Sequence, residues 1–142
     1  MKTINKFKMQ LCAKSTNESF ARASVGAFIA QLDPTIEEIS DIKTAVSEAV
    51  TNCIVHAYKE QNGDIYITVK IFENNKVKII IRDKGCGIVD IKKAMEPLYT
   101  TGGSERAGLG FAVMESFTDK PRVISKVGKG TTVTLFKEIK SK

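Results

Sequence analysis

A carboxylate and a carboxamide lie four positions apart in the stretch Ser47-Glu48-Ala49-Val50-Thr51-Asn52. Successive helix residues are about 100° apart, so positions four apart lie nearly one above the other. Glu48, Asn52 and His56 would therefore form a polar file along one helix edge. A carboxylate can accept a proton, and an amide oxygen is a neutral ligand for a hard cation. The spacing fits acid–base chemistry beside a metal, and it also fits a plain solvent-facing polar strip.

A second carboxylate, Asp83, comes directly after an alternating apolar run at residues 77–81 and directly before Gly85 and Gly87. A carboxylate at the end of a strand can accept a hydrogen bond from an exocyclic amine, such as that of adenine. A loop aspartate that binds neighbouring backbone N–H groups fits this position equally well.

Three glycine pairs follow the ends of expected strands and helices: Gly85/Gly87, Gly108/Gly110 and Gly128/Gly130. Glycine permits positive φ and lets a ligand approach the backbone closely. The middle pair opens an expected helix, where free N–H groups and the positive dipole end favour an anion such as phosphate. The chain has neither G-x-x-x-x-G-K-[ST] nor a G-x-G-x-x-G after a strand, so two common phosphate-binding loops are excluded. Each pair alone also fits ordinary turns.

The elements that must position these residues follow from hydrophobic periodicity. Alternating patterns predict strands at residues 4–12, 65–71, 77–81, 122–127 and 131–136. Short turns at Asn74-Asn75 and at residues 128–130 join two pairs of these strands into antiparallel hairpins. We therefore predict an α+β fold, a two-layer sandwich in which helices cover one face of a mixed, mostly antiparallel sheet.

Two helices are predicted before the first hairpin. Capping-box spacings begin them at Ser15–Glu18 and at Thr35–Glu38. The second helix, which carries Glu48 and Asn52, should end near residues 58–59. Its core-facing arc is predicted to hold Ile42, Val46, Ala49, Val50, Cys53 and Ala57. A short helix at 91–95, an irregular segment at 96–107 and a helix from Gly108 should follow, and residues 137–142 should form a solvated end.

Composition fits one soluble domain over residues 1–142. The net charge of +6 suits an acidic protein partner or a polyphosphate, but no basic stripe with interleaved aromatics points to nucleic acid. Three scattered cysteines argue against a disulfide framework or zinc site and for a reducing cytoplasm. We expect no signal peptide and no membrane span.

The motifs taken together resemble a known superfamily, that of the ATPases of histidine kinases, type II topoisomerases, MutL and Hsp90-like chaperones. Its four boxes match Glu48-x-x-x-Asn52, Asp83-x-Gly85-x-Gly87, Gly108-Leu109-Gly110 and Gly128-x-Gly130-Thr131-Thr132. Four spaced boxes over nearly the whole chain are far more specific than any one. Residues 17–22, 31–35 and 47–52 further resemble the small anti-sigma serine kinases of endospore-forming bacteria. The resemblance implies a Bergerat-type ATP-binding fold and an ATP- and Mg²⁺-dependent serine/threonine-protein kinase.

The resemblance also implies a role for each matched residue. Asn52 would be the Mg²⁺ ligand, and Glu48 the general base for an incoming serine. Asp83 would bind the adenine amino group. Gly87 would let the base lie close, and Thr131 would support it through its hydroxyl or a water.

Residues 96–107 would form a lid over the triphosphate, with Gly108 and Gly110 as its hinge. Further nucleotide contacts implied by the resemblance are Gly85, Thr100, Thr101 and Leu109. Arg106 would reach the terminal phosphate. Because it is assigned by its proximity to Gly108, a surface arginine is the alternative.

The implied partners are the sporulation sigma factor F and an anti-anti-sigma factor that is phosphorylated on serine. Arg22 would contact a protein partner, and the chain would be a cytoplasmic homodimer with no direct contact to nucleic acid or membrane. Three alternatives stay open: a stress-response sigma-B type kinase, a nucleotide-gated binding module without phosphotransfer, and a basic nucleic-acid binder. The single histidine, His56, is expected to be a core or boundary side chain and not a phosphate acceptor.

Overall fold

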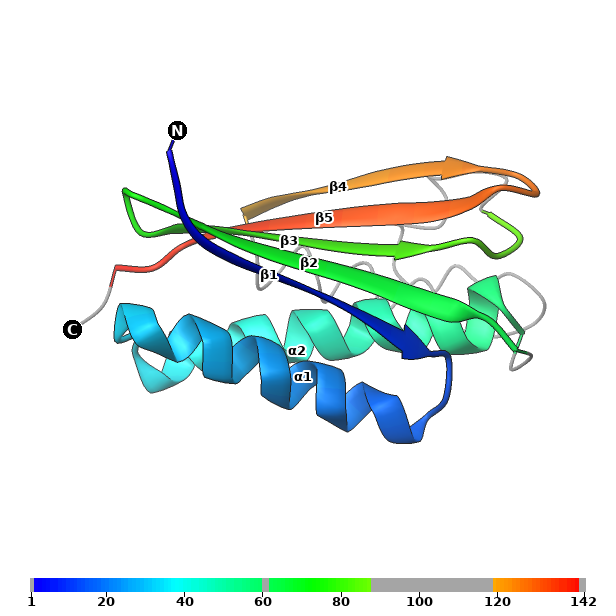
Figure 1. Ribbon diagram of the computed structural model, residues 1–142, viewed down its shortest axis with the longest axis horizontal. Helices are drawn as coiled ribbons and strands as arrows, with labels where there is room; N and C mark the ends of the chain where they lie inside the picture. The colour runs from blue at the N-terminus through cyan, green and yellow to red at the C-terminus, as the bar shows by residue number, and fades with distance from the viewer. Residues whose placement is uncertain (1, 60–61, 88–118, 141–142) are drawn as a thin grey trace.

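A computed structural model of the chain describes residues 2–59, 62–87 and 119–140. Figure 1 shows two layers, with both α-helices beneath one face of a sheet. The elements in chain order are β1 (Thr3–Cys12), α1 (Thr16–Ile29), η1 (Ala30–Leu32), α2 (Ile36–Asn52), η2 (Cys53–Ala57), β2 (Asp64–Phe72), β3 (Lys76–Asp83), β4 (Asp119–Lys126) and β5 (Gly130–Glu138). The helices expected at 91–95 and from Gly108, and the segment 96–107, lie outside the described residues.

The five described strands form one sheet in the order β1-β2-β3-β5-β4. All four strand pairings are antiparallel. The predicted α+β sandwich is confirmed, but within the described strands the sheet is antiparallel throughout and not mixed. The reason is that β5, and not β4, pairs with β3. Because β4 is antiparallel to β5, β4 runs parallel to β3, and direct pairing of β4 with β3 would have made the sheet mixed. Asp83 therefore faces Thr131 across the β3–β5 pairing.

The core lies between the sheet and the two helices, and its strand residues alternate as expected. Residues with at most 1% of their surface exposed come from both layers: Val25, Ile29, Ile42, Val46, Ile65, Ile67, Val69, Ile71, Val77, Ile79 and Ile81. Fully burying one such side chain contributes roughly 1.5–3 kcal/mol. This packing fixes α2 against the sheet and thereby fixes the position of its C-terminal end.

The two predicted capping boxes had different outcomes. The Thr35 hydroxyl accepts from the Glu38 N–H (3.1 Å), and a Glu38 carboxylate oxygen accepts from the Thr35 N–H (2.9 Å), so the second box is confirmed. The first is wrong: Ser15 has φ −58° and ψ −31° and makes no capping bond. An N-cap needs an extended backbone, which Ser15 lacks. The Asn17 side chain instead donates to the Cys12 carbonyl oxygen (2.8 Å) and ties α1 to β1.

Helix α2 ends at Asn52, earlier than predicted, and continues as a π-helical turn, η2. The Tyr58 N–H donates to the carbonyl oxygen of Cys53, five residues back (3.0 Å). A π turn holds more residues than an α turn, so the predicted register is lost beyond Asn52. Glu48 still lies one α turn before Asn52, but His56 no longer continues their file. His56 is half-buried, as expected of a boundary residue.

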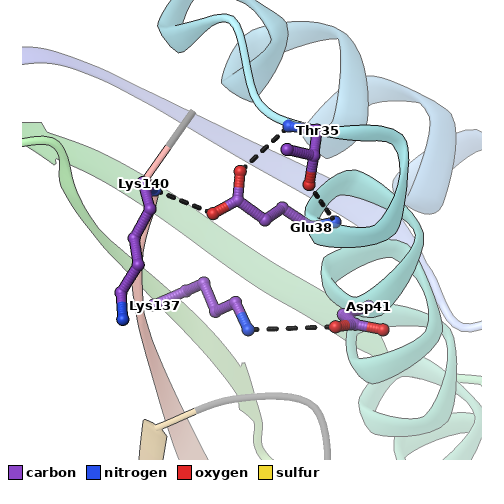
Figure 2. Close-up of polar contacts among 5 residues, drawn as sticks. All are labelled: Thr35, Glu38, Asp41, Lys137 and Lys140. Carbon is purple, nitrogen blue, oxygen red and sulfur yellow. Dashed lines mark hydrogen bonds and ion pairs between the residues drawn. The ribbon is translucent and has the colours of Figure 1, made fainter. Parts of the chain in front are cut away.

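The expected solvated C-terminal end is wrong. Strand β5 continues to Glu138, and Ile139 is only 2% exposed. The Lys140 N–H donates to the second carboxylate oxygen of Glu38 (2.7 Å), and the Lys137 ammonium lies 3.9 Å from Asp41 (Figure 2). The terminal segment is held because Ile139 is apolar and because the capping box leaves one Glu38 oxygen available.

Within the described part of the chain, no helix is both long enough and apolar enough to cross a bilayer.

Candidate functional site

The end of β3, the turn η2 and the β4–β5 turn lie at the same end of the sheet (Figure 1). Backbone hydrogen bonds join them. The Cys86 N–H donates to the Ala57 carbonyl oxygen (3.0 Å), and the Gly128 N–H donates to the Cys86 carbonyl oxygen (2.8 Å). Backbone hydrogen bonds therefore hold the loop that follows Asp83 on both sides.

Three glycines allow these backbones to meet: Gly85, Gly87 and Gly130. A Cβ on Gly85 would overlap the carbonyl oxygen of Ala57, and one on Gly87 would overlap that of Lys126. A Cβ on Gly130 would overlap the carbonyl oxygen of Asp83. The structure thus gives these three of the predicted glycines a packing function in addition to any role in admitting a ligand.

Asp83 lies at the centre of this end and is only 5% exposed. Its Oδ1 accepts from the backbone N–H groups of Gly85 (2.9 Å) and Thr131 (3.1 Å), and its Oδ2 accepts from the Cys53 thiol (3.5 Å). Burial is the largest influence on the carboxyl and raises its pKa, although the three donors act in the opposite direction. Asp83 is therefore a buried, well-oriented acceptor.

Asn52 is the last residue of α2, directly before Cys53. Both polar atoms of its carboxamide are buried, and neither has a hydrogen-bond partner among the residues that the structure describes. A buried amide without partners is costly, by about 1–3 kcal/mol for each group. A neutral amide oxygen in this state suits the ligand preferences of Mg²⁺, so the residues present fit the predicted metal.

Glu48 lies one helical turn before Asn52 and is half-buried. A carboxylate at this position is reached from the same side of the helix as the Asn52 amide. The spacing predicted from the sequence is preserved here because the π turn begins only after Asn52.

Thr131 also lies in the cluster, where its backbone N–H and its hydroxyl have different partners. Its backbone N–H binds Asp83, and its hydroxyl shares a 2.8 Å hydrogen bond with the Ser125 hydroxyl. The Ser125 hydroxyl also donates to the Gly130 carbonyl oxygen (3.2 Å). The described support for Asp83 thus comes from the backbone of Thr131.

Arg22 is not part of this cluster. It lies on α1, where its guanidinium is 3.6 Å from Glu18. Six of the residues predicted to contact the nucleotide lie outside the described part of the chain: Thr100, Thr101, Arg106, Gly108, Leu109 and Gly110.

Three residues of this end were missed by sequence reasoning: Cys53, Tyr58 and Ser125. Burial raises the pKa of the Cys53 thiol well above its usual value, and the charge of Asp83 adds to this. The Tyr58 hydroxyl accepts from the Lys84 N–H (2.7 Å), and burial first of all raises its pKa. No sequence signal marks Cys53 or Tyr58, whereas Ser125 lies directly across from Thr131 in the last hairpin.

The family described as histidine kinase-like ATPase domain matches residues 12–137. The chain therefore belongs to the histidine kinase-like ATPase domain family. Among solved structures, the RsbU and RsbW domains of a Mycobacterium tuberculosis protein share its fold with a TM-score of 0.69 at 21% identity, over 95% of this chain and 32% of that one. The mycobacterial sensor histidine kinase MprB matches with a TM-score of 0.58 at 12% identity, over 96% of this chain and 100% of that one. At sequence identities this low, the two matches show that the fold is shared and nothing more.

The curated relatives are much more similar in sequence to this chain than the solved structures are. The anti-sigma F factor of Thermoanaerobacter sp. (strain X514) is 56% identical over 143 residues, which cover 99% of this chain and 99% of the relative. That of Geobacillus thermodenitrificans (strain NG80-2) is 52% identical, over 95% of this chain and 93% of the relative. The resemblance to anti-sigma factors of the histidine kinase-like ATPase superfamily, which was inferred from the motifs, is confirmed.

Proposed function

We propose that the chain is an ATP- and Mg²⁺-dependent protein-serine kinase that also acts as an anti-sigma factor. It sequesters sigma factor F and phosphorylates the anti-anti-sigma antagonist on serine. The family and the names of the relatives support this proposal. The observation that carries it is the buried carboxamide of Asn52, without a described partner, one turn after Glu48 and next to the residue that contacts Asp83.

In this proposal, each described residue has one task. Asn52 Oδ1 would hold Mg²⁺, which when bound would supply positive charge to the phosphate oxygens of ATP. Asp83 accepts a hydrogen bond from the adenine amino group. Glu48 accepts the proton of the attacking serine hydroxyl. The serine oxygen bonds to the γ-phosphorus while the bond to the β,γ-bridging oxygen breaks, and ADP leaves.

Further residues keep the assignments that the resemblance implies. Gly85, Gly87 and Thr131 line the base, and Gly108, Leu109 and Gly110 bind phosphates at a helix start. Thr100 and Thr101 belong to the lid. Arg106 stabilises the charge of the transferred group.

The protein partners are proposed on the same basis. Arg22 contacts a protein partner from α1, where it is partly exposed and paired only with Glu18 among the described ion pairs. The chain forms a homodimer. Sedimentation at micromolar concentration should give twice the 15.6 kDa of one chain, and a species of 15.6 kDa alone would contradict the dimer.

The direct test is phosphoryl transfer from radiolabelled ATP to the purified antagonist. Wild type should yield phosphoserine, and Glu48→Gln should lower the rate by roughly 10²–10⁴-fold, the usual contribution of a general base. Glu37→Gln, an exposed carboxylate on the same helix, is the matched control and should retain full activity. If wild type binds ATP but leaves its γ-phosphate intact, the chain is a nucleotide-gated binding module and not a kinase.

A further inference from the structure

The two oxygens of the Asp83 carboxylate are used unequally. Oδ1 accepts from the N–H groups of Gly85 (2.9 Å) and Thr131 (3.1 Å). A carboxylate oxygen offers about two lone-pair sites, so Oδ1 has no site left. A ligand that donates to Asp83 must therefore bind Oδ2.

Oδ2 already has one partner from the protein, the thiol of Cys53 at 3.5 Å. Cys53 is 4% exposed and Asp83 is 5% exposed, so bulk water does not compete for this contact. The thiol occupies one acceptor site of Oδ2 and leaves one. If only Oδ1 were hydrogen-bonded, the carboxylate could rotate about Oδ1 and Oδ2 could move. Among the described residues, the Cys53 thiol is the side chain that restrains Oδ2.

Cys53 reaches Asp83 because of where α2 changes to a π turn. It is the first residue of η2 and follows Asn52 directly. The same short backbone segment therefore carries the proposed metal ligand and the side chain that touches the proposed base-binding carboxylate.

We propose that Cys53 is a positioning residue for adenine recognition. Its thiol holds Oδ2 so that the second acceptor site of this oxygen receives the 6-amino group of adenine. This inference rests on the proposed nucleotide-binding function and adds to it a residue that sets the choice of base.

The consequence is a specific discrimination between purines. The 6-amino group of adenine donates a hydrogen bond to Oδ2. A 6-oxo purine has a carbonyl oxygen at the same position, and this oxygen cannot donate to Oδ2 because both atoms are acceptors. A site built to bind a donor strongly disfavours a ligand that lacks it. The preference for ATP over inosine triphosphate (ITP) should thus depend on how firmly Oδ2 is held.

The experiment measures the dissociation constants of ATP and ITP for the full chain by calorimetry. Cys53→Ala should reduce the preference for ATP over ITP by roughly fivefold, equivalent to one net hydrogen bond of about 1 kcal/mol. Cys53→Ser keeps a donor at the same position and should retain most of the preference. Val46→Ala, a buried position on α2, is the matched control for lost packing: it should lower Tm and leave the preference unchanged.

Two results would overturn the proposal. In one, Cys53→Ala weakens ATP and ITP equally, which is the behaviour of a purely structural residue. In the other, Cys53→Ser loses as much preference as Cys53→Ala, so that the donor is irrelevant. Both leave ATP binding by wild type intact and so spare the proposed function. If wild type binds neither nucleotide, the proposed function fails and this inference fails with it.

Discussion

At the scale of single residues, the site is defined by polar groups placed where water cannot reach them. Asn52 has two buried polar atoms without described partners, and Asp83 is a buried carboxylate. Each placement costs folding free energy. Such costs are expected at a binding site, where the ligand supplies the missing partners.

Replacing Asn52 should separate folding from binding. Asn52→Ala removes two unsatisfied polar atoms, so the free energy of unfolding of the ligand-free chain should stay unchanged or rise by up to about 1 kcal/mol. Binding of ATP in the presence of Mg²⁺ should weaken at least about tenfold, because the metal loses its amide ligand. Thermal unfolding without ligand and calorimetry with and without Mg²⁺ measure the two effects.

Asn17→Ala is the control for an asparagine that has a partner. Its amide donates to the Cys12 carbonyl oxygen, so its loss should lower stability by roughly 0.5–1.5 kcal/mol and leave nucleotide binding unchanged. If Asn52→Ala is the more destabilising of the two, the Asn52 carboxamide has a structural partner after all.

Asp83 should show its burial in the pH dependence of stability. Burial raises its pKa in the folded chain, so the folded state holds the proton more tightly than the unfolded state. The stability of wild type relative to Asp83→Asn should therefore fall as pH rises from about 4 through the raised pKa, and then stay constant. Thermal unfolding of both proteins across this range gives the difference. A difference that grows in favour of wild type with rising pH would contradict the assignment.

At the scale of elements, the site depends on a change of helix type and on backbone contacts. The sequence pattern correctly predicted the hairpins and the long helix because alternation and the 3.6-residue period are local properties. It could not predict the π turn at Cys53–Ala57, which stands where the helix end meets the loop after Asp83. The failed cap at Ser15 has a similar cause, since the backbone there is set by the connection from β1.

In the candidate site too, the local spacing of residues could be predicted from the sequence, whereas contacts between distant elements could not. The pairing of Glu48 with Asn52 and the position of Asp83 at a strand end could be read from spacing. The contact between Cys53 and Asp83 could not, because it joins residues thirty positions apart through the packing of a helix on a sheet. A buried thiol also looks like any small apolar residue in a core pattern.

Two glycines of one turn allow a sharp test of the backbone contacts. Gly128 (φ +76°) and Gly130 (φ +121°) both have positive φ, but a Cβ on Gly128 meets nothing within 4 Å, whereas one on Gly130 meets the Asp83 backbone. Gly128→Ala should cost about 1 kcal/mol for its backbone conformation alone. Gly130→Ala should cost more and should also weaken ATP binding, because it displaces Asp83. Denaturant unfolding and calorimetry measure both, and equal effects on affinity would contradict the contact.

At the scale of the whole molecule, the C-terminal segment closes the fold against the start of α2. Glu38 binds the N–H groups of both Thr35 and Lys140, the latter 102 positions away in the chain. The buried Ile139 lies directly before this contact. One carboxylate therefore serves as a helix cap and as an anchor for the end of the chain.

Glu38→Ala should lower the free energy of unfolding by roughly 1–3 kcal/mol, because it removes a capping bond and leaves backbone N–H groups without their acceptor. Asp41→Ala, which breaks only the 3.9 Å ion pair with Lys137, should cost less than about 1 kcal/mol. Denaturant unfolding gives both values. Equal losses would mean that the two hydrogen bonds of Glu38 together add no more to stability than this ion pair.

The backbone clamp around Asp83 also bears on how this sequence can diverge over evolutionary time. Its hydrogen bonds join the main chain of Ala57, Cys86 and Gly128, so they do not depend on which side chains those positions of the loop and helix end carry. Only the glycines without room for a Cβ are fixed by the contact. Homologues should therefore retain the two glycines that flank position 86 more strictly than the cysteine itself, whose thiol adds a 3.5 Å contact to the His56 carbonyl oxygen.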